Sequence, residues 1–160
     1  MTDTIERSEI HATFVVERTY DAPPARVFAA WADPAAKARW FAGPEEWEAA
    51  GHELDFRVGG REVSRGSPQG GPVHTYDAHY HDIVPDERIV STYELHVDGT
   101  RISVSLATVE FKPAGAGTRL IYTEQGAFLD GHDSPALREQ GTGALLGALG
   151  AELRRGPANT

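Results

Sequence analysis

Short turns divide the second half of the chain into segments that can pair only with their neighbours. Asp98-Gly99 predicts a two-residue β-hairpin, because the tightest hairpin turns favour Asp and Gly at their central positions. Further breaks, rich in proline or glycine, lie at 67–72, 85–87 and 112–117. A parallel return would need a crossover of about a dozen residues, which these loops are too short to supply. The sequence therefore predicts an antiparallel meander.

The segments between these turns are rich in β-branched and aromatic residues, the composition of strands. With one segment near the N-terminus, they predict a sheet of about six to seven strands. Gly59-Gly60 is expected to break or bulge this sheet. The expected strands are 11–20, 54–58, 61–66, 73–83, 89–97, 101–111 and 118–125.

Prolines place two short helices directly after the first strand. Pro24 suits the first turn of a helix that continues through Trp31, because this turn does not use the N–H group that proline lacks. Asp33-Pro34 ends that helix and can cap a second one at 35–41, which Gly43-Pro44 ends in turn.

The last expected element is a long helix that can open at Pro135 and run to about Arg155. Because a sheet with one apolar face needs a cover, we expect this helix to pack against the sheet. The predicted fold is α+β, with the antiparallel sheet curled around this C-terminal helix. Four leucines gather on one face of the helix: Leu145, Leu146, Leu149 and Leu153.

Gly143, Gly147 and Gly150 form a smooth strip beside the leucine face of the same helix. Glycine weakens a helix, so packing rather than propensity must hold this one. The strip can admit the close approach of another backbone, including a second subunit in a homodimer. The alternative is a glycine-rich face that contacts solvent, and the sequence leaves both interpretations open.

Length and charge restrict what the chain can be. Its 160 residues fit a single domain, expected at 10–156, with flexible tails at 1–9 and 157–160. A formal charge of -9 argues against a nucleic-acid partner. No apolar run approaches the ~18 residues that span a membrane, and no secretory signal is evident. Because cysteine is absent, we expect a cytoplasmic protein without disulfides or thiolate metal sites.

Few side chains stand out as candidates for chemistry. Glu124 shares a strand face with Leu120 and Tyr122, and a carboxyl group in an apolar pocket can act as an acid or a base. The alternative is a Glu at the sheet margin that pairs with an arginine. His79 and His81 share another strand face, but two imidazoles alone do not make a zinc site. No nucleotide-binding motif occurs, so we expect neither a metal nor a cofactor.

The charged pair Asp55 and Arg57, and the single residue Arg18, also have structural interpretations. Asp55 and Arg57 lie on one face of an expected strand and are interpreted as an ion pair. Arg18 lies on the strand face of Val16 and Tyr20. It can be an inward anchor for an anionic ligand, or a residue at the mouth of a pocket that is bonded to a carboxylate.

Several segments together form the pattern of a known family. They are Ala22 to Pro34, Arg39-Trp40-Phe41 with Gly43-Pro44, Asp55 to Gly60 (D-x-R-x-G-G), Ala78 to Arg88, Phe111 with Gly117-Thr118-Arg119-Leu120, and Gly141 with Leu145 and Leu149. Over roughly residues 10–155 the chain resembles the activator of heat-shock-protein-90 ATPase homologue-like family. That family belongs to the START-like helix-grip superfamily, which includes the birch pollen allergen and polyketide cyclases. The resemblance implies a helix-grip fold and says less about activity, because this fold hosts many functions.

Three positions depart from the family pattern. Ala78 stands where the family has glycine, and Asp82 stands where it has glutamate. Thr142 replaces a tryptophan that would fill space between the helix and the sheet. We therefore expect a larger and slightly more polar pocket beside Thr142.

We expect the protein to bind an apolar or amphipathic small molecule in a cavity between the sheet and the C-terminal helix, and not to be an enzyme. Small-molecule sites are largely apolar with a few polar groups. One alternative is a cofactor-free cyclase or hydrolase that uses Glu124, His79 or Tyr122 as acid or base. Another, implied by the resemblance alone, is a chaperone-interacting or stress-response module. The expected ligand-binding residues are Trp31, Trp40, Phe41, Phe56, Tyr80, Tyr93, Tyr122, Glu124, Thr142, Leu145 and Leu149.

Overall fold

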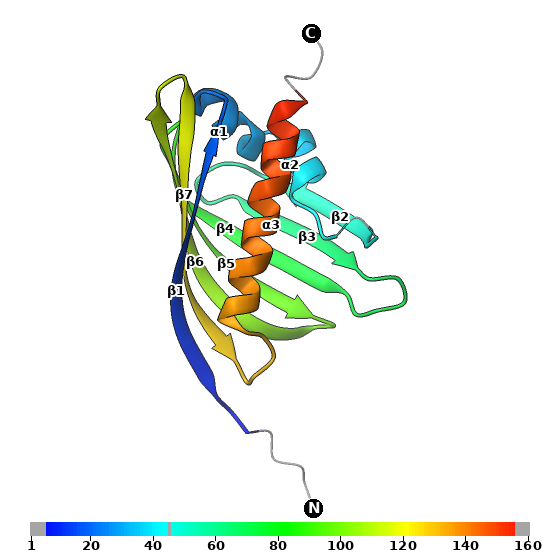
Figure 1. The fold of residues 1–160 in the computed structure, drawn as a ribbon. Helices are drawn as coiled ribbons and strands as arrows, with labels where there is room; N and C mark the ends of the chain where they lie inside the picture. Colours follow the sequence, from blue (N-terminus) through cyan, green and yellow to red (C-terminus); the bar gives the residue numbers. More distant parts are fainter. Residues whose placement is uncertain (1–5, 45, 156–160) are drawn as a thin grey trace, which may run out of the picture.

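A seven-stranded sheet and three helices make up the part of the chain that the structure, a computed structural model, describes: residues 6–44 and 46–155 (Figure 1). The predicted tails fall in part on residues 1–5 and 157–160, which lie outside the described residues. The helices are α1 (Pro24–Ala32), α2 (Pro34–Trp40) and α3 (Pro135–Arg154). The strands are β1 (Glu9–Tyr20), β2 (Glu48–Leu54), β3 (Arg61–Ser67), β4 (His74–Val84), β5 (Arg88–Val97), β6 (Thr100–Ala114) and β7 (Gly117–Leu129).

The strands form one open sheet in the order β1-β7-β6-β5-β4-β3-β2. Every neighbouring pair is antiparallel, and β2 to β6 each pair with the next strand along the chain. The predicted meander is therefore confirmed, as is the α+β class with a C-terminal helix. β1 joins the sheet beside β7, so the first and last strands of the chain are neighbours.

The Asp98-Gly99 hairpin is confirmed. The φ angles of Asp98 and Gly99 are 48° and 83°, in the left-handed region that Asp tolerates and Gly adopts freely. Val97 and Thr100 pair directly across the turn. The Asp98 carboxylate also accepts a hydrogen bond of 2.8 Å from the Val73 N–H, which ties the hairpin to the start of β4.

The expected strand at 54–58 is wrong: the edge strand β2 ends at Leu54, and the next residues form a turn. This turn requires glycine at position 60, because a side chain there would collide with the Asp55 carbonyl oxygen. The Gly60 N–H donates to the Arg57 carbonyl at 2.7 Å. Asp55 and Arg57 do form the expected ion pair, at 2.8 Å, but they are exposed residues of a turn.

The loop expected at 126–134 begins later than predicted, because β7 continues to Leu129. Gly126 lets the strand continue, since a Cβ there would stand 2.8 Å from the Ser105 hydroxyl of β6. Phe128 then lies fully buried. The sequence signal of Gly126 therefore marked a close contact between strands and not a chain break.

Helix α3 lies on the inner side of the curled sheet, and α1 and α2 cover one end (Figure 1). The closest backbone neighbours of α3 are β1, α2 and α1. The Tyr20 hydroxyl of β1 donates to the Leu146 carbonyl at 2.7 Å, and a Cβ at Gly150 would stand 3.4 Å from the Tyr20 ring. Among the described residues, part of the glycine strip is thus approached by side chains of β1, Tyr20 at Gly150 and Arg18 at Gly143. None of the described helices is long and apolar enough to cross a membrane.

Gly147 differs from Gly150, because a Cβ at Gly147 would meet nothing within 4 Å. We expect Gly147→Ala to raise the free energy of unfolding by about 0.5–1 kcal/mol, since alanine loses less backbone entropy in a helix. Urea denaturation measures this change, with Gly150→Val as a destabilised control. A lower free energy of unfolding in Gly147→Ala would contradict the open surroundings of Gly147 and would indicate that Gly147 packs against a second subunit.

Candidate functional site

Two clusters of polar side chains lie buried on the inner face of the sheet. One is centred on Glu124 of β7 and the other on Glu62 of β3, and both carboxyl groups are fully buried. We call them the Glu124 cluster and the Glu62 cluster. Each carboxylate is surrounded by hydrogen-bond donors from several elements, as a buried charge requires.

The Glu124 cluster joins three neighbouring strands. The hydroxyls of Tyr93 on β5 and Ser105 on β6 donate to Oε2 of Glu124 at 2.7 and 2.8 Å. The Tyr122 hydroxyl, two residues away on β7, donates to Oε1 at 3.0 Å. A guanidinium nitrogen of Arg138 lies 3.3 Å from Oε2. Both alternatives weighed for Glu124 are partly right, because it is interior and it pairs with an arginine.

Arg138 anchors the first turns of α3 to the sheet. Besides Glu124, it donates to the Tyr93 hydroxyl and to Ser103 Oγ, each at 2.7 Å, and to Asp133 at 2.6 Å. Its side chain is 9 % exposed, so these bonds replace almost all of its contact with water. No periodic pattern indicates Arg138, because its partners Tyr93, Ser103 and Glu124 lie 45, 35 and 14 residues away along the chain.

The Glu62 cluster lies where α2 meets the far side of the sheet. Lys37 of α2 donates to Oε1 of Glu62 at 2.6 Å, and the Tyr80 hydroxyl of β4 donates to the same oxygen at 2.7 Å. His52 of β2 contacts Oε2 through Nε2 at 2.7 Å. Because an ionised carboxylate only accepts, this histidine nitrogen carries the hydrogen.

The surroundings of Lys37 keep this ion pair away from water. The Lys37 ammonium lies 4.5 Å from the centre of the Phe41 ring and 5.2 Å from that of Trp31. Burial alone would raise the pKa of Glu62, but the Lys37 charge and the hydrogen bonds outweigh it. Together they lower this pKa from its ordinary value of 4.5 to about 2.

Tyr76 of β4 lies between the two clusters. Its ring is 4.7 Å from the Tyr93 ring and 4.8 Å from the Phe41 ring. Burial raises the pKa of the Tyr76 hydroxyl well above its usual value, and the charge of Glu62 raises it further. Tyr76 is nevertheless partly exposed. Its two-residue spacing from Tyr80, which the sequence does show, was the signal that could have added it to the expected site.

The expected ligand-binding residues divide into two groups. Partly exposed members lie against the core and are Phe41, Phe56, Tyr122 and Leu145. The buried members are Trp31, Trp40, Tyr80, Tyr93, Glu124, Thr142 and Leu149. The side chain of Trp31 has a buried indole N–H without a hydrogen-bond partner among the described residues.

His79 lies away from both clusters. It is exposed, with its Nε2 4.0 Å from Asp77, and His81 is exposed and bonded to Thr92 at 2.8 Å. Across residues 6–44 and 46–155, no group of three His, Asp or Glu side chains is placed to hold a metal ion. Among the acid–base candidates, the structure therefore brings Glu124 and Tyr122 together and leaves His79 apart.

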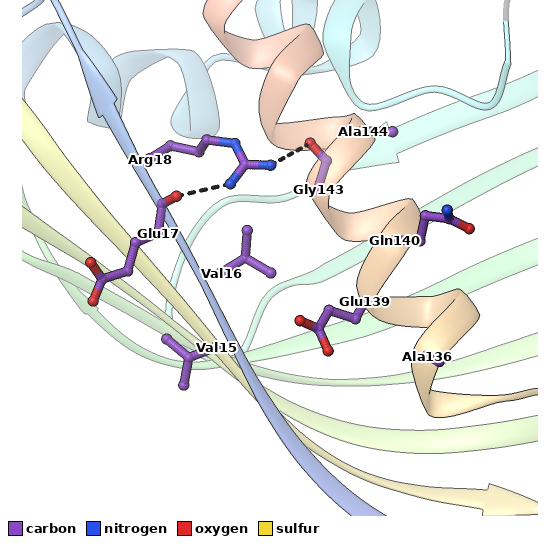
Figure 2. A pocket seen from close by; sticks show the side chains of 9 residues that line it. All are labelled: Val15, Val16, Glu17, Arg18, Ala136, Glu139, Gln140, Gly143 and Ala144. Atoms are coloured by element: carbon purple, nitrogen blue, oxygen red, sulfur yellow. Dashed lines mark hydrogen bonds between the residues drawn. The ribbon is translucent and has the colours of Figure 1, made fainter.

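A groove of about 610 Å³ runs between β1 and α3. Figure 2 shows Arg18 reaching from β1 across this groove to the Gly143 carbonyl. Arg18 donates to that oxygen at 3.4 Å and to the Glu17 carbonyl at 2.9 Å. Its bonds are therefore to carbonyls, and the alternative that bonded it to a carboxylate is wrong. Glu139 and Gln140 of α3 add polar groups to the lining, which includes none of the expected ligand-binding residues.

The chain belongs to the family described as Activator of Hsp90 ATPase homolog 1-like protein, whose sequence model matches residues 21–154. The resemblance seen in the sequence is thus confirmed. A search among curated proteins found no match.

Solved structures extend the comparison. An uncharacterized protein from Rhizobium leguminosarum is 49% identical, with a TM-score of 0.89 over 94% of this chain and 99% of that one. The Mll3558 protein from Rhizobium loti is 54% identical, with a TM-score of 0.84 over 91% and 99%. An AHSA1-like protein from Aeromonas hydrophila, at 19% identity and a TM-score of 0.69 over 93% and 99%, shares the fold.

The buried pair of Lys37 and Glu62 yields a test of energetic coupling. We expect Glu62→Leu alone to cost about 3–5 kcal/mol of stability, because it leaves the Lys37 charge buried without a partner. Lys37→Met combined with Glu62→Leu removes both charges and should recover much of that loss. Urea denaturation of the wild type, both single variants and the double variant measures the coupling, which we expect to be on the order of 2 kcal/mol. Additive losses would contradict it.

The low pKa of Glu62 makes stability depend on pH. Between pH 4.5 and about 2 the unfolded chain binds a proton at Glu62 that the folded chain does not. The free energy of unfolding should therefore fall as the pH is lowered through this window, by about 3 kcal/mol from this group. Denaturation at several pH values measures the slope. The Lys37→Met/Glu62→Leu variant lacks the titrating group and should show a shallower slope; an equal slope would refute the assignment.

Proposed function

We propose that the protein binds an apolar or amphipathic small molecule on the inner face of the sheet, beside α3 and against Tyr76, Tyr122 and Leu145. We name this place the tyrosine recess. The observation that carries the proposal is that both tyrosines are partly exposed although burial raises the pKa of their hydroxyls.

The raised pKa values of the two hydroxyls indicate that these partly exposed tyrosines are also desolvated. Burial is the largest cause that raises the pKa of both the Tyr76 and the Tyr122 hydroxyl well above the usual value. A tyrosine on the outer surface would be accessible but not desolvated, and one in a packed core would be desolvated but not accessible. Side chains that are both accessible and desolvated are expected to line a recess.

The dimensions of the fold favour the same place. Seven strands at the usual spacing span roughly 30 Å, whereas a helix with its side chains is about 10–12 Å wide. α3 packs against the edge strand β1, so the inner faces of β3, β4 and β5 extend beyond it (Figure 1). Leu145 is the partly exposed leucine that lies on the flank of α3 away from Gly143 and Gly150, the two glycines beside β1.

The groove between β1 and α3 suits an apolar ligand less well. Its lining includes three exposed, charged side chains, those of Glu17, Arg18 and Glu139. A desolvated apolar site with a few polar groups describes the tyrosine recess better.

Neither the enzyme function nor the chaperone-binding function is supported by a comparable observation. An acid–base role for Glu124 would need a free lone pair directed at a substrate, whereas this carboxylate already accepts from Tyr93, Ser105, Tyr122 and Arg138. A chaperone-binding role rests on the family's name. The exposed large apolar side chains of the described residues come from five segments and are Ile10 and Val15 of β1, Val58, Val73, Val104 and Leu137.

The experiment is a fluorescence titration with prodan, a neutral amphipathic naphthalene whose emission shifts to the blue in an apolar site. We expect saturable binding, and we expect Leu145→Trp to weaken it at least tenfold by filling the recess. Leu137→Trp is the matched control, because Leu137 lies on the same helix and is 63 % exposed. Both variants are checked for an unchanged unfolding midpoint. Equal weakening by the two substitutions, or no saturable binding by the wild type, would contradict the proposal.

A further inference from the structure

We infer that the tyrosine recess takes uncharged or cationic ligands that carry a hydrogen-bond donor, such as aromatic alcohols and amines, and that it excludes carboxylates, sulfates and phosphates. This inference rests on the proposed function and specifies the ligand class of that same site.

The first argument is the balance of charge on the inner face. Lys37 is paired with Glu62, and these two charges cancel. Arg138 is shared between Glu124 and Asp133, which leaves the Glu124 cluster with one more negative than positive charge. Desolvation lowers the pKa of His74, whose ring centre lies 4.6 Å from that of Trp47, and so favours a neutral imidazole near pH 7. An anionic ligand would therefore meet excess negative charge in a poorly solvated place.

The second argument is that the charges of the buried cations are already paired with carboxylates. Both terminal nitrogens of Arg138 are already bonded, one to Tyr93 and Glu124 and the other to Ser103 and Asp133. The Lys37 ammonium is bonded to Glu62 and Tyr80. Binding an anion would require breaking one of these pairs, which leaves a buried charge without its partner.

The third argument is the direction of the hydrogen bonds. The Tyr122 hydroxyl gives its only proton to Oε1 of Glu124, so its oxygen can offer a ligand only an acceptor. Tyr93 likewise donates to Glu124 and accepts from Arg138. A ligand hydroxyl or amine can donate to the Tyr122 oxygen, whereas a carboxylate has no proton to give.

The rings around this acceptor favour a flat partner. Tyr76 lies against Tyr93 with an angle of 36° between the rings, and edge-on to Phe41 at 67°. An aromatic ligand can join such a set by offset or edge contacts. A cationic group also gains from the faces of these rings.

The test uses four probes that share one ring system: 2-methylnaphthalene, 2-naphthalenemethanol, 2-naphthylmethylamine and 2-naphthoate. Ligand-observed NMR titrations at pH 7 measure their dissociation constants. We expect the alcohol and the amine to bind at least tenfold more tightly than the carboxylate. We also expect Tyr122→Phe to abolish the advantage of the alcohol over the hydrocarbon while the hydrocarbon still binds. Tyr20→Phe removes a tyrosine hydroxyl bonded elsewhere, to Leu146, and should leave that advantage intact.

The outcomes separate the two proposals. If the hydrocarbon binds and the carboxylate binds as tightly as the alcohol or the amine, the inference about ligand class is overturned and the proposed function stands. If Tyr122→Phe leaves the preference for the alcohol unchanged, the assigned acceptor is wrong. If none of the probes binds, the proposed function fails and the ligand class fails with it.

Discussion

The inner face of the sheet is wider than the one long helix that covers it. Seven strands span roughly 30 Å, and α3 lies against the β1 edge, where Tyr20 donates to the Leu146 carbonyl. The short helices α1 and α2 close one end of the sheet (Figure 1). What is left is the inner surface of the strands beyond α3, where Tyr76 of β4 is partly exposed. Tyr122, on β7 beside β1, is also partly exposed. In this account the place for a ligand follows from the dimensions of the fold.

The same surface carries the buried charges. Glu62 and Glu124 lie on the inner face at opposite sides of Tyr76, and each is paired with a cation from a helix, Lys37 of α2 or Arg138 of α3. Buried ion pairs contribute little net stability, but breaking one is costly, so they fix which helix residue meets which strand. The helices are thereby held in one position relative to the sheet. Because both cations are already paired, an excess negative charge remains beside the proposed recess.

The sequence allowed most of the fold to be predicted, and two of the three residues that define the proposed recess, Tyr122 and Leu145, were among the expected ligand-binding residues. Turns such as Asp98-Gly99 are local, so their chemistry can be interpreted without knowing the rest of the chain. Edges and close contacts were harder. The strand expected at 54–58 is a turn that needs Gly60, and β7 continues through Gly126, which marks a close contact between strands and not a break. The pairs of Lys37 with Glu62 and of Arg138 with Glu124 join distant residues, and no local pattern indicates such a pairing.

The central claim is the location of the ligand, and intermolecular nuclear Overhauser effects from bound 2-naphthalenemethanol test it most directly. The account predicts contacts from the naphthalene protons to the rings of Tyr76 and Tyr122 and to the methyl groups of Leu145. The side chains of Val15 and Ala144, which line the groove between β1 and α3, should show no such contacts. Contacts to Val15 and Ala144 with none to the tyrosines would place the ligand in that groove and would contradict the account.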